Sequence, residues 1–342
     1  MTIASAGLPP ASLALAVGLG AVVLATLWPL GTWTVALAGA GLWHVLAELR
    51  YVRARFGAAI IGPIAAAVVG GLAAIVVLRL TLITSTFEAA AGPLATLSFA
   101  ATRLELALVV GLALVGAWWA RRLGRTPLLA AAFGALMVVG LARWPVTTVL
   151  VLAALHNLTP LGFLAEALPP ARRAVGLLLA ATLLLGLPLL VATGVPWRLA
   201  ASLGLGWPEA SWLGTEGLSW AIGTALPADW LDPDAEMHAF AGLLVAQLMH
   251  YGAVIEVLPR VAEAVGTPQA RLPGWRLAAM ALAIALLWAL FAWDFRVGRS
   301  VYGLFAAIHA WLEVPLLLAW LAPRRRALAP GGGPGHDRGQ TG

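Results

Sequence analysis

Long runs of apolar residues make up most of this chain, and short polar stretches separate them. Most runs hold about twenty residues, the length that an α-helix needs to cross the hydrocarbon core of a bilayer. We therefore expect an all-α integral membrane protein with about ten transmembrane helices in one bundle, over residues 10–28, 33–52, 57–78, 99–119, 127–142, 145–168, 174–195, 237–258, 275–293 and 300–322. The bundle forms one domain over residues 1–326, and the Gly-rich tail over 327–342 is predicted to be disordered.

Arginines cluster after every second predicted helix, as Arg50, Arg53 and Arg55, then Arg121, Arg122 and Arg125, then Arg172 and Arg173, then Arg260, Arg271 and Arg276, and finally Arg324, Arg325 and Arg326. Basic residues mark the cytoplasmic side of a membrane protein. The clusters therefore predict that both termini lie inside. The long polar stretch over 196–236 is then an outer loop, and its five tryptophans predict a segment at the level of the lipid head groups.

Composition agrees with a membrane protein, since 61% of the 342 residues are hydrophobic and only 11% are charged. The net charge of +6 comes from the arginine clusters, so it reports membrane topology and we expect no nucleic-acid partner. The absence of cysteine excludes disulfides and thiolate metal sites. The absence of lysine excludes a Schiff-base cofactor. We expect the protein in the bacterial inner (cytoplasmic) membrane.

Four histidines interrupt the apolar segments at similar depths: His44, His156, His250 and His309. They lie in the second, sixth, eighth and tenth segments, which run in the same direction under the predicted topology. Each follows about nine to thirteen residues from the outer end of its segment, or about 14–20 Å at 1.5 Å per residue. All four are therefore expected near the middle of a ~30 Å hydrocarbon core. Whether they converge depends on the order of helices around the bundle, which the chain does not reveal.

Two of the histidines are followed four residues later by a glutamate, as His44–Glu48 and His309–Glu313. The two members of each pair share one helix face, one turn apart. Imidazole and carboxylate ligands suit iron, manganese or zinc, and mixed sites with open positions suit non-haem iron and dioxygen. The sequence predicts a metal site formed by His44, His156, His250, His309, Glu48 and Glu313.

Four side chains near the histidines are candidates for catalytic steps: Glu48, Glu313, Gln247 and Tyr251. The two glutamates are expected to bind the metal or to orient the imidazoles. Gln247 is three residues before the histidine of the eighth segment and can hydrogen-bond a ring nitrogen or a bound oxygen species. Tyr251 adjoins the same histidine and suits proton or radical steps.

The first functional hypothesis is a metal-dependent oxidoreductase that uses non-haem iron and dioxygen. Its partner is a hydrophobic small molecule or lipid, such as a polyene, isoprenoid, acyl chain or quinone, because the site is reached from within the bilayer. A second hypothesis is b-type haem held by pairs of histidines, in an electron-transfer or haem-handling protein. A third is a proton- or metal-coupled transporter, which predicts inverted repeats. Hydrogen bonds between helices explain the histidines without any ion. The oligomeric state stays open.

Other polar residues in or beside the apolar segments are predicted to be structural. Arg103 and Glu105 are two residues apart, so they diverge on a helix and each is expected to find a partner on another helix. Glu256, six residues after a histidine, faces another side of its helix and is a weaker ligand candidate. The outer end of the ninth segment is predicted to form a loop ion-pair group of Asp294, Arg296 and Arg299.

Overall fold

The computed structural model describes residues 11–88, 94–205, 233–264 and 272–320, and every regular element in these ranges is helical. The elements are α1 (Ala11–Leu27), α2 (Pro29–Val35), η1 (Ala36–Gly41), α3 (Leu42–Phe56), η2 (Gly57–Ala59), α4 (Gly62–Glu88), α5 (Leu94–Arg122), α6 (Leu128–Arg143), α7 (Pro145–His156), α8 (Thr159–Ala167), α9 (Pro170–Ala181), η3 (Thr182–Gly186), α10 (Leu187–Ala192), α11 (Val195–Ser202), α13 (Pro233–Gly252), η5 (Ala253–Val257), α14 (Leu258–Ala264), α15 (Gly274–Trp293) and α16 (Phe295–Trp320). The all-helical expectation is confirmed for these residues.

Within the described ranges, seven helical stretches are long and apolar enough to cross a membrane: Pro29–Ala59, Gly62–Thr81, Ala100–Arg122, Pro170–Ala192, Asp234–Arg260, Gly274–Trp293 and Phe295–Trp320. Helices α7 and α8 form a further candidate that bends by 41°. Helices α1 and α6 are apolar but shorter. Each of these stretches falls on one of the apolar segments of the sequence. The count of ten spans stays a prediction.

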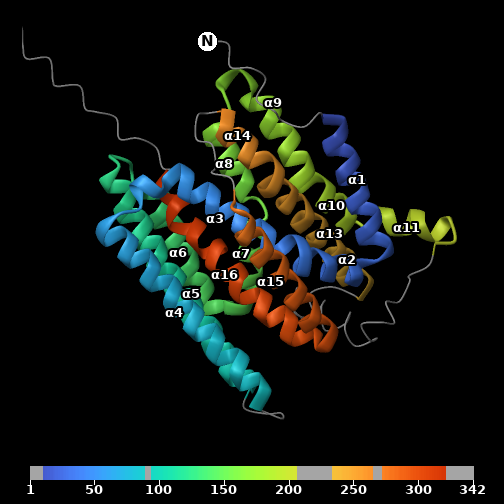
Figure 1. The fold of residues 1–342 in the computed structure, drawn as a ribbon, viewed down its shortest axis with the longest axis horizontal. Helices are drawn as coiled ribbons and strands as arrows, with labels where there is room; N and C mark the ends of the chain where they lie inside the picture. The colour runs from blue at the N-terminus through green and yellow to red at the C-terminus, as the bar shows by residue number, and fades with distance from the viewer. Residues whose placement is uncertain (1–10, 89–93, 206–232, 265–271, 321–342) are drawn as a thin grey trace, which may run out of the picture.

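Helix α16 lies in the middle of the ribbon, with α4, α5 and α6 on one side and α13, α10 and α1 on the other (Figure 1). It packs against α3, α4, α5 and α15. Its approach to α5 is very close, because a Cβ atom on Gly116 would lie 3.0 Å from Cα of Pro315. Gly116 therefore permits a backbone contact that a larger residue would prevent.

Three of the membrane-length stretches contain a π-helical turn: η1 before α3, η3 before α10, and η5 after α13. Such turns often occur at functional sites. η1 ends three residues before His44, and η5 begins three residues after His250. Each turn rotates the helix beyond it relative to a regular α-helix. Two of the turns thus lie directly beside predicted metal ligands.

A partly buried ion pair and its neighbouring hydrogen bond join α4, α5 and α16. Arg79 Nη2 donates to Glu105 Oε1 at 2.7 Å, and Trp311 Nε1 donates to the same oxygen at 2.7 Å. The expectation that Glu105 pairs with another helix is confirmed. Because Glu105 is only 6% exposed, its charge depends on these two donors.

The predicted ion-pair group at the start of α16 is wrong for Arg299. Asp294 Oδ1 accepts the backbone N–H groups of Arg296 and Val297, at 2.8 and 3.0 Å, and so caps the N-terminus of α16. Arg299, one turn further on, lines an internal cavity. Asp294 thus acts as a helix cap, and Arg299 lies apart from the expected group.

Most of the predicted outer loop, at residues 206–232, and the predicted tail lie outside the described residues. Of the five loop tryptophans, Trp197 is described, and it is buried in α11.

Substitution of Glu105 tests whether its ion pair stabilises the bundle. Glu105→Ala leaves Arg79 without its carboxylate, which we expect to cost about 3 kcal/mol. Glu105→Gln keeps an oxygen for Trp311 and should cost less. Thermal unfolding of the two variants in the same detergent checks this order, and equal stabilities of Glu105→Ala and wild type would refute it.

Candidate metal centre

The four histidines of the apolar segments converge from four parts of the chain. His44 lies on α3, His156 is the last residue of α7, His250 lies on α13 and His309 on α16. His309 Nε2 lies 2.9 Å from His44 Nε2 and 3.0 Å from His156 Nε2. The ring of His250 lies 4.6 Å from that of His156, centroid to centroid. The four histidines, which the sequence predicts at a common depth, therefore also contact one another.

One carboxylate, that of Glu48 on α3, completes the group. His44, Glu48, His156, His250 and His309 each offer a ligand atom, and these atoms lie within 4.8 Å of one another. Glu48 Oε2 is 3.9 Å from His250 Nε2. This group can hold a metal ion. Its five members share an interior position, four of them at most 1% exposed.

Glu313 contacts the group from one side. Its Oε2 lies 2.8 Å from His156 Nδ1, within hydrogen-bond distance. A carboxylate that binds the far nitrogen of a ligating imidazole fixes the tautomer and the ring orientation. Glu313, expected from the sequence as a ligand or an orienting acceptor, thus occupies the orienting position.

The hydrogen bonds on the outer side of the cluster fix which nitrogens face inward. When Glu313 is ionised, His156 Nδ1 donates to it, and His309 Nδ1 lies 3.4 Å from the carbonyl oxygen of Phe305, which can only accept. A neutral imidazole with a proton on Nδ1 presents a lone pair on Nε2. Two lone pairs would then meet in the 3.0 Å contact between His156 and His309. A cation between them, either a proton or a metal ion, removes this repulsion.

Several buried polar atoms in the cluster have no hydrogen-bond partner in the protein: Nδ1 of His44, both ring nitrogens of His250, Oε2 of Glu48 and Oε1 of Glu313. The carboxyl groups of Glu48 and Glu313 also interact with each other. Two neighbouring carboxylates in a buried site cannot both be charged without a cation between them. Either one of them holds a proton, or both share a metal ion. The cluster therefore lacks positive charge where its oxygens meet.

The spacing of the nitrogens suits a small ion. Two ligands at right angles, each about 2.1 Å from one ion, lie about 3 Å apart. The observed Nε2 separations are 2.9 and 3.0 Å. These separations fit two ligands of one ion, and they also fit an N–H···N hydrogen bond between two imidazoles.

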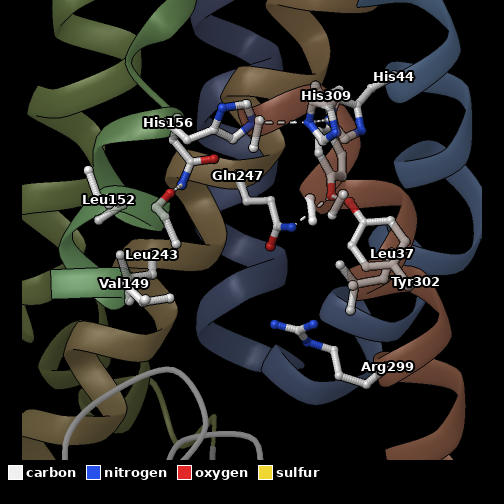
Figure 2. Close-up of a pocket in the computed structure, with 18 of the residues that line it drawn as sticks. Leu37, His44, Val149, Leu152, His156, Leu243, Gln247, Arg299, Tyr302 and His309 are labelled. Carbon is white, nitrogen blue, oxygen red and sulfur yellow. Dashed lines mark hydrogen bonds between the residues drawn. The ribbon is translucent and has the colours of Figure 1, made fainter. Parts of the chain in front are cut away.

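The chain breaks at His156 for a local reason. Pro160 has no N–H, so it cannot bond the carbonyl of His156 four residues earlier. The hydroxyl of Thr159 donates to that carbonyl instead, at 2.8 Å. The two helices α7 and α8 bend by 41° at this point. The bend places the His156 ring at the end of a helix, directed toward His309 (Figure 2).

A chain of polar side chains leads away from the histidines. Tyr251 stacks on the ring of His44, with centroids 4.0 Å apart and planes 23° apart. Tyr251 Oη lies 2.5 Å from Tyr302 Oη and accepts from Gln247 Nε2 at 2.7 Å. Gln247 thus contacts a tyrosine hydroxyl instead of a histidine ring. Sequence reasoning placed Tyr251 beside His250, whereas its closest ring partner is His44.

A cavity of about 300 Å³ opens from the cluster. Three of the histidines, Gln247, Tyr251 and Tyr302 line it. Its other walls are largely apolar, from residues such as Val149, Leu152 and Leu243 (Figure 2). Arg79 and Arg299 also line it. Neither was predicted to belong to the site, although a charged residue within an apolar helix is the signal that would have identified Arg79.

Glu256, the weaker ligand candidate, lies outside the cluster. Its side chain is 60% exposed and accepts from Arg260 Nη2 at 2.7 Å, one turn along the helix. The different helix face expected from the sequence explains this position.

Comparison with known proteins adds no analogy, since no family model, no curated protein and no solved structure matches this chain. The candidate site is therefore argued from its own geometry.

Replacement of Glu313 tests its orienting role. Glu313→Gln keeps the shape but removes the charge that fixes His156, so we expect metal affinity to fall about 10- to 100-fold with the stoichiometry retained. The matched control is Glu256→Gln, at an exposed glutamate, which should bind metal as wild type does. Competition with a chromophoric chelator measures the affinities. Equal affinities for Glu313→Gln and wild type would show that Glu313 does not orient the site.

Proposed function

We propose that this chain is a membrane-embedded, metal-dependent oxidoreductase that uses non-haem iron and dioxygen on a hydrophobic substrate. The observation that supports it most is the convergence of four imidazoles and two carboxylates in a buried site that opens into a largely apolar cavity. An ion-binding site reached through such a cavity suits a lipid-soluble substrate such as a polyene, isoprenoid, acyl chain or quinone.

In this proposal the chain spans the bacterial inner membrane ten times, with both termini inside. The helical stretches fall on all ten apolar segments, and the arginine clusters of the sequence follow every second one. Many large apolar side chains are exposed on the outer surface, among them Leu114, Leu136, Val175 and Leu282. Such a surface is suited to contact with lipid.

The iron would be held by His44, His156, His250, His309 and Glu48, while Glu313 holds His156 in place. Iron with open positions supplies the activation of dioxygen. The same ligand types also accept manganese or zinc. The protein itself would supply a largely apolar cavity that aligns an apolar substrate beside the reacting atoms.

The packing of the rings favours a small ion over b-type haem. The ring centroids of His44 and His309 are 4.6 Å apart, and those of His44 and His250 are 5.3 Å apart, in edge-to-face contact. A porphyrin between axial histidines needs a planar slot between their rings. Direct contact between the rings leaves no such slot, and bis-histidine ligation does not use the adjoining carboxylates.

Ferrous reconstitution under anaerobic conditions tests the enzyme proposal. The ferrous protein should show no Soret band, should bind nitric oxide with the electron paramagnetic resonance signal of a high-spin ferrous nitrosyl, and should consume oxygen with a polyene, an isoprenoid quinone or a long-chain fatty acid. Bound iron that reacts with neither nitric oxide nor oxygen would contradict the oxidoreductase proposal.

The tyrosine beside His44 is the proposed proton donor of the reaction. Tyr251→Phe preserves the stack on His44 but removes the hydroxyl that links Gln247 and Tyr302. We expect iron content to be retained and kcat to fall about 100-fold, the lower range for loss of a general acid. Turnover and iron content of the same preparation measure both quantities. An unchanged kcat would exclude Tyr251 from proton transfer.

A further inference from the structure

The cavity has two chemically different ends. The histidines lie at one end and Arg299 at the other, with Gln247 between them and Val149, Leu152 and Leu243 along one wall (Figure 2). Arg299 and His309 are ten residues apart on α16, which corresponds to about 15 Å along the helix axis. A ligand that fills the cavity can therefore contact the metal centre and Arg299 together.

The end opposite the histidines carries excess positive charge. Arg79 is matched by Glu105 at 2.7 Å. Among the described residues, no carboxylate lies within ion-pair distance of Arg299, and its Nε is buried without a hydrogen-bond partner. Its guanidinium lies 5.5 Å from the ring centroid of Trp33, a contact that orients the cation but does not neutralise it. A guanidinium so placed within an apolar bundle is costly without an anion.

The two guanidinium groups converge on Gly303. A Cβ atom there would lie 3.1 Å from Arg299 Nη1 and 3.4 Å from Arg79 Nη1. Arg79 Nη1 donates to the carbonyl oxygen of Gly303 at 2.8 Å. The missing side chain of Gly303 thus leaves room for both cations at one point of the cavity wall. One carboxylate faces two guanidinium groups, so this end of the cavity has a net charge of one positive unit that an anionic ligand can neutralise.

We propose that Arg299 binds the acidic head group of the substrate, and that the cavity takes a single-chain carboxylic acid, such as a fatty or isoprenoid acid, with its chain directed to the histidines. That the acid is a substrate rests on the proposed function, whereas its binding at Arg299 does not. Guanidinium groups bind carboxylates through paired hydrogen bonds in one plane. The apolar walls between the two ends accommodate the chain, and the volume of about 300 Å³ fits one narrow chain.

Binding measurements on the full-length protein, purified in detergent, test the inference. The probes are a saturated fatty acid, the alcohol of the same chain length and the alkyl phosphate of the same length, titrated by calorimetry. We expect wild type to prefer the acid over the alcohol. Arg299→Gln should weaken acid binding about 10- to 100-fold, as expected for loss of a charged hydrogen bond, and leave alcohol binding unchanged.

Two further variants act as controls. Arg299→Lys keeps the charge, so it should retain a preference for the acid at reduced affinity. Arg276→Gln removes another arginine that lies over a tryptophan, with the guanidinium 5.1 Å from the Trp275 ring, but on the exposed surface. It should bind all three probes as wild type does.

The inference is overturned if wild type binds acid and alcohol equally, if Arg299→Gln keeps the preference, or if the alkyl phosphate binds more tightly than the acid. The first and third results need no variant, so they hold even if Arg299→Gln misfolds. Metal content is measured on the same samples. Arg299-dependent acid binding in protein without any metal affinity would contradict only the oxidoreductase proposal, whereas stoichiometric iron without acid preference would contradict only the head-group site.

Discussion

The structure depends on a compensation of charge inside an apolar bundle. An acidic side chain at the middle of a membrane helix costs about 2.5–3.5 kcal/mol, and this chain places Glu48 and Glu313 there together. Among the described residues, neither carboxylate forms an ion pair with an arginine. The two carboxyl groups contact each other, and imidazole nitrogens lie 2.8 Å from Glu313 and 3.9 Å from Glu48. A structural metal site contributes about 10–16 kcal/mol in small metal-binding domains, which is enough to offset both glutamates. A shared cation, either a proton or a metal ion, therefore accounts for the burial of these residues together.

Helix α16 links the separate parts of the site. It carries His309 and Glu313 at the candidate metal centre, Tyr302 in the polar chain, and Arg299 at the far end of the cavity. It is also fixed to its neighbours by the bond from Trp311 to Glu105. One helix thus sets the distance between the proposed head-group site and the proposed reacting position, so a shift of α16 would alter both.

Much of the architecture could be predicted from the sequence, because apolar runs of bilayer length specify helices directly. The shared depth of His44, His156, His250 and His309 also followed from counting residues. Their convergence could not be deduced, because it depends on helix order and on bends such as the one at Pro160. Arg79 was missed because the predicted segment ended at residue 78, before the charge. The helix α4 continues to Glu88, and Glu105 on α5 pairs with Arg79. The direction of Arg299 depends on Trp33 and Gly303, which are distant in sequence from any pattern around it.

The central claim is that the histidine cluster binds a metal ion, and metal analysis of protein purified without chelators, with its visible and X-ray absorption spectra, tests it most directly. The account predicts stoichiometric iron without a Soret band, with nitrogen and oxygen ligands at about 2.0–2.2 Å. It also predicts loss of that iron in His309→Ala, because His309 contacts two of the other histidines. Folded protein that contains no metal and takes up none on addition of ferrous iron, manganese or zinc would contradict it.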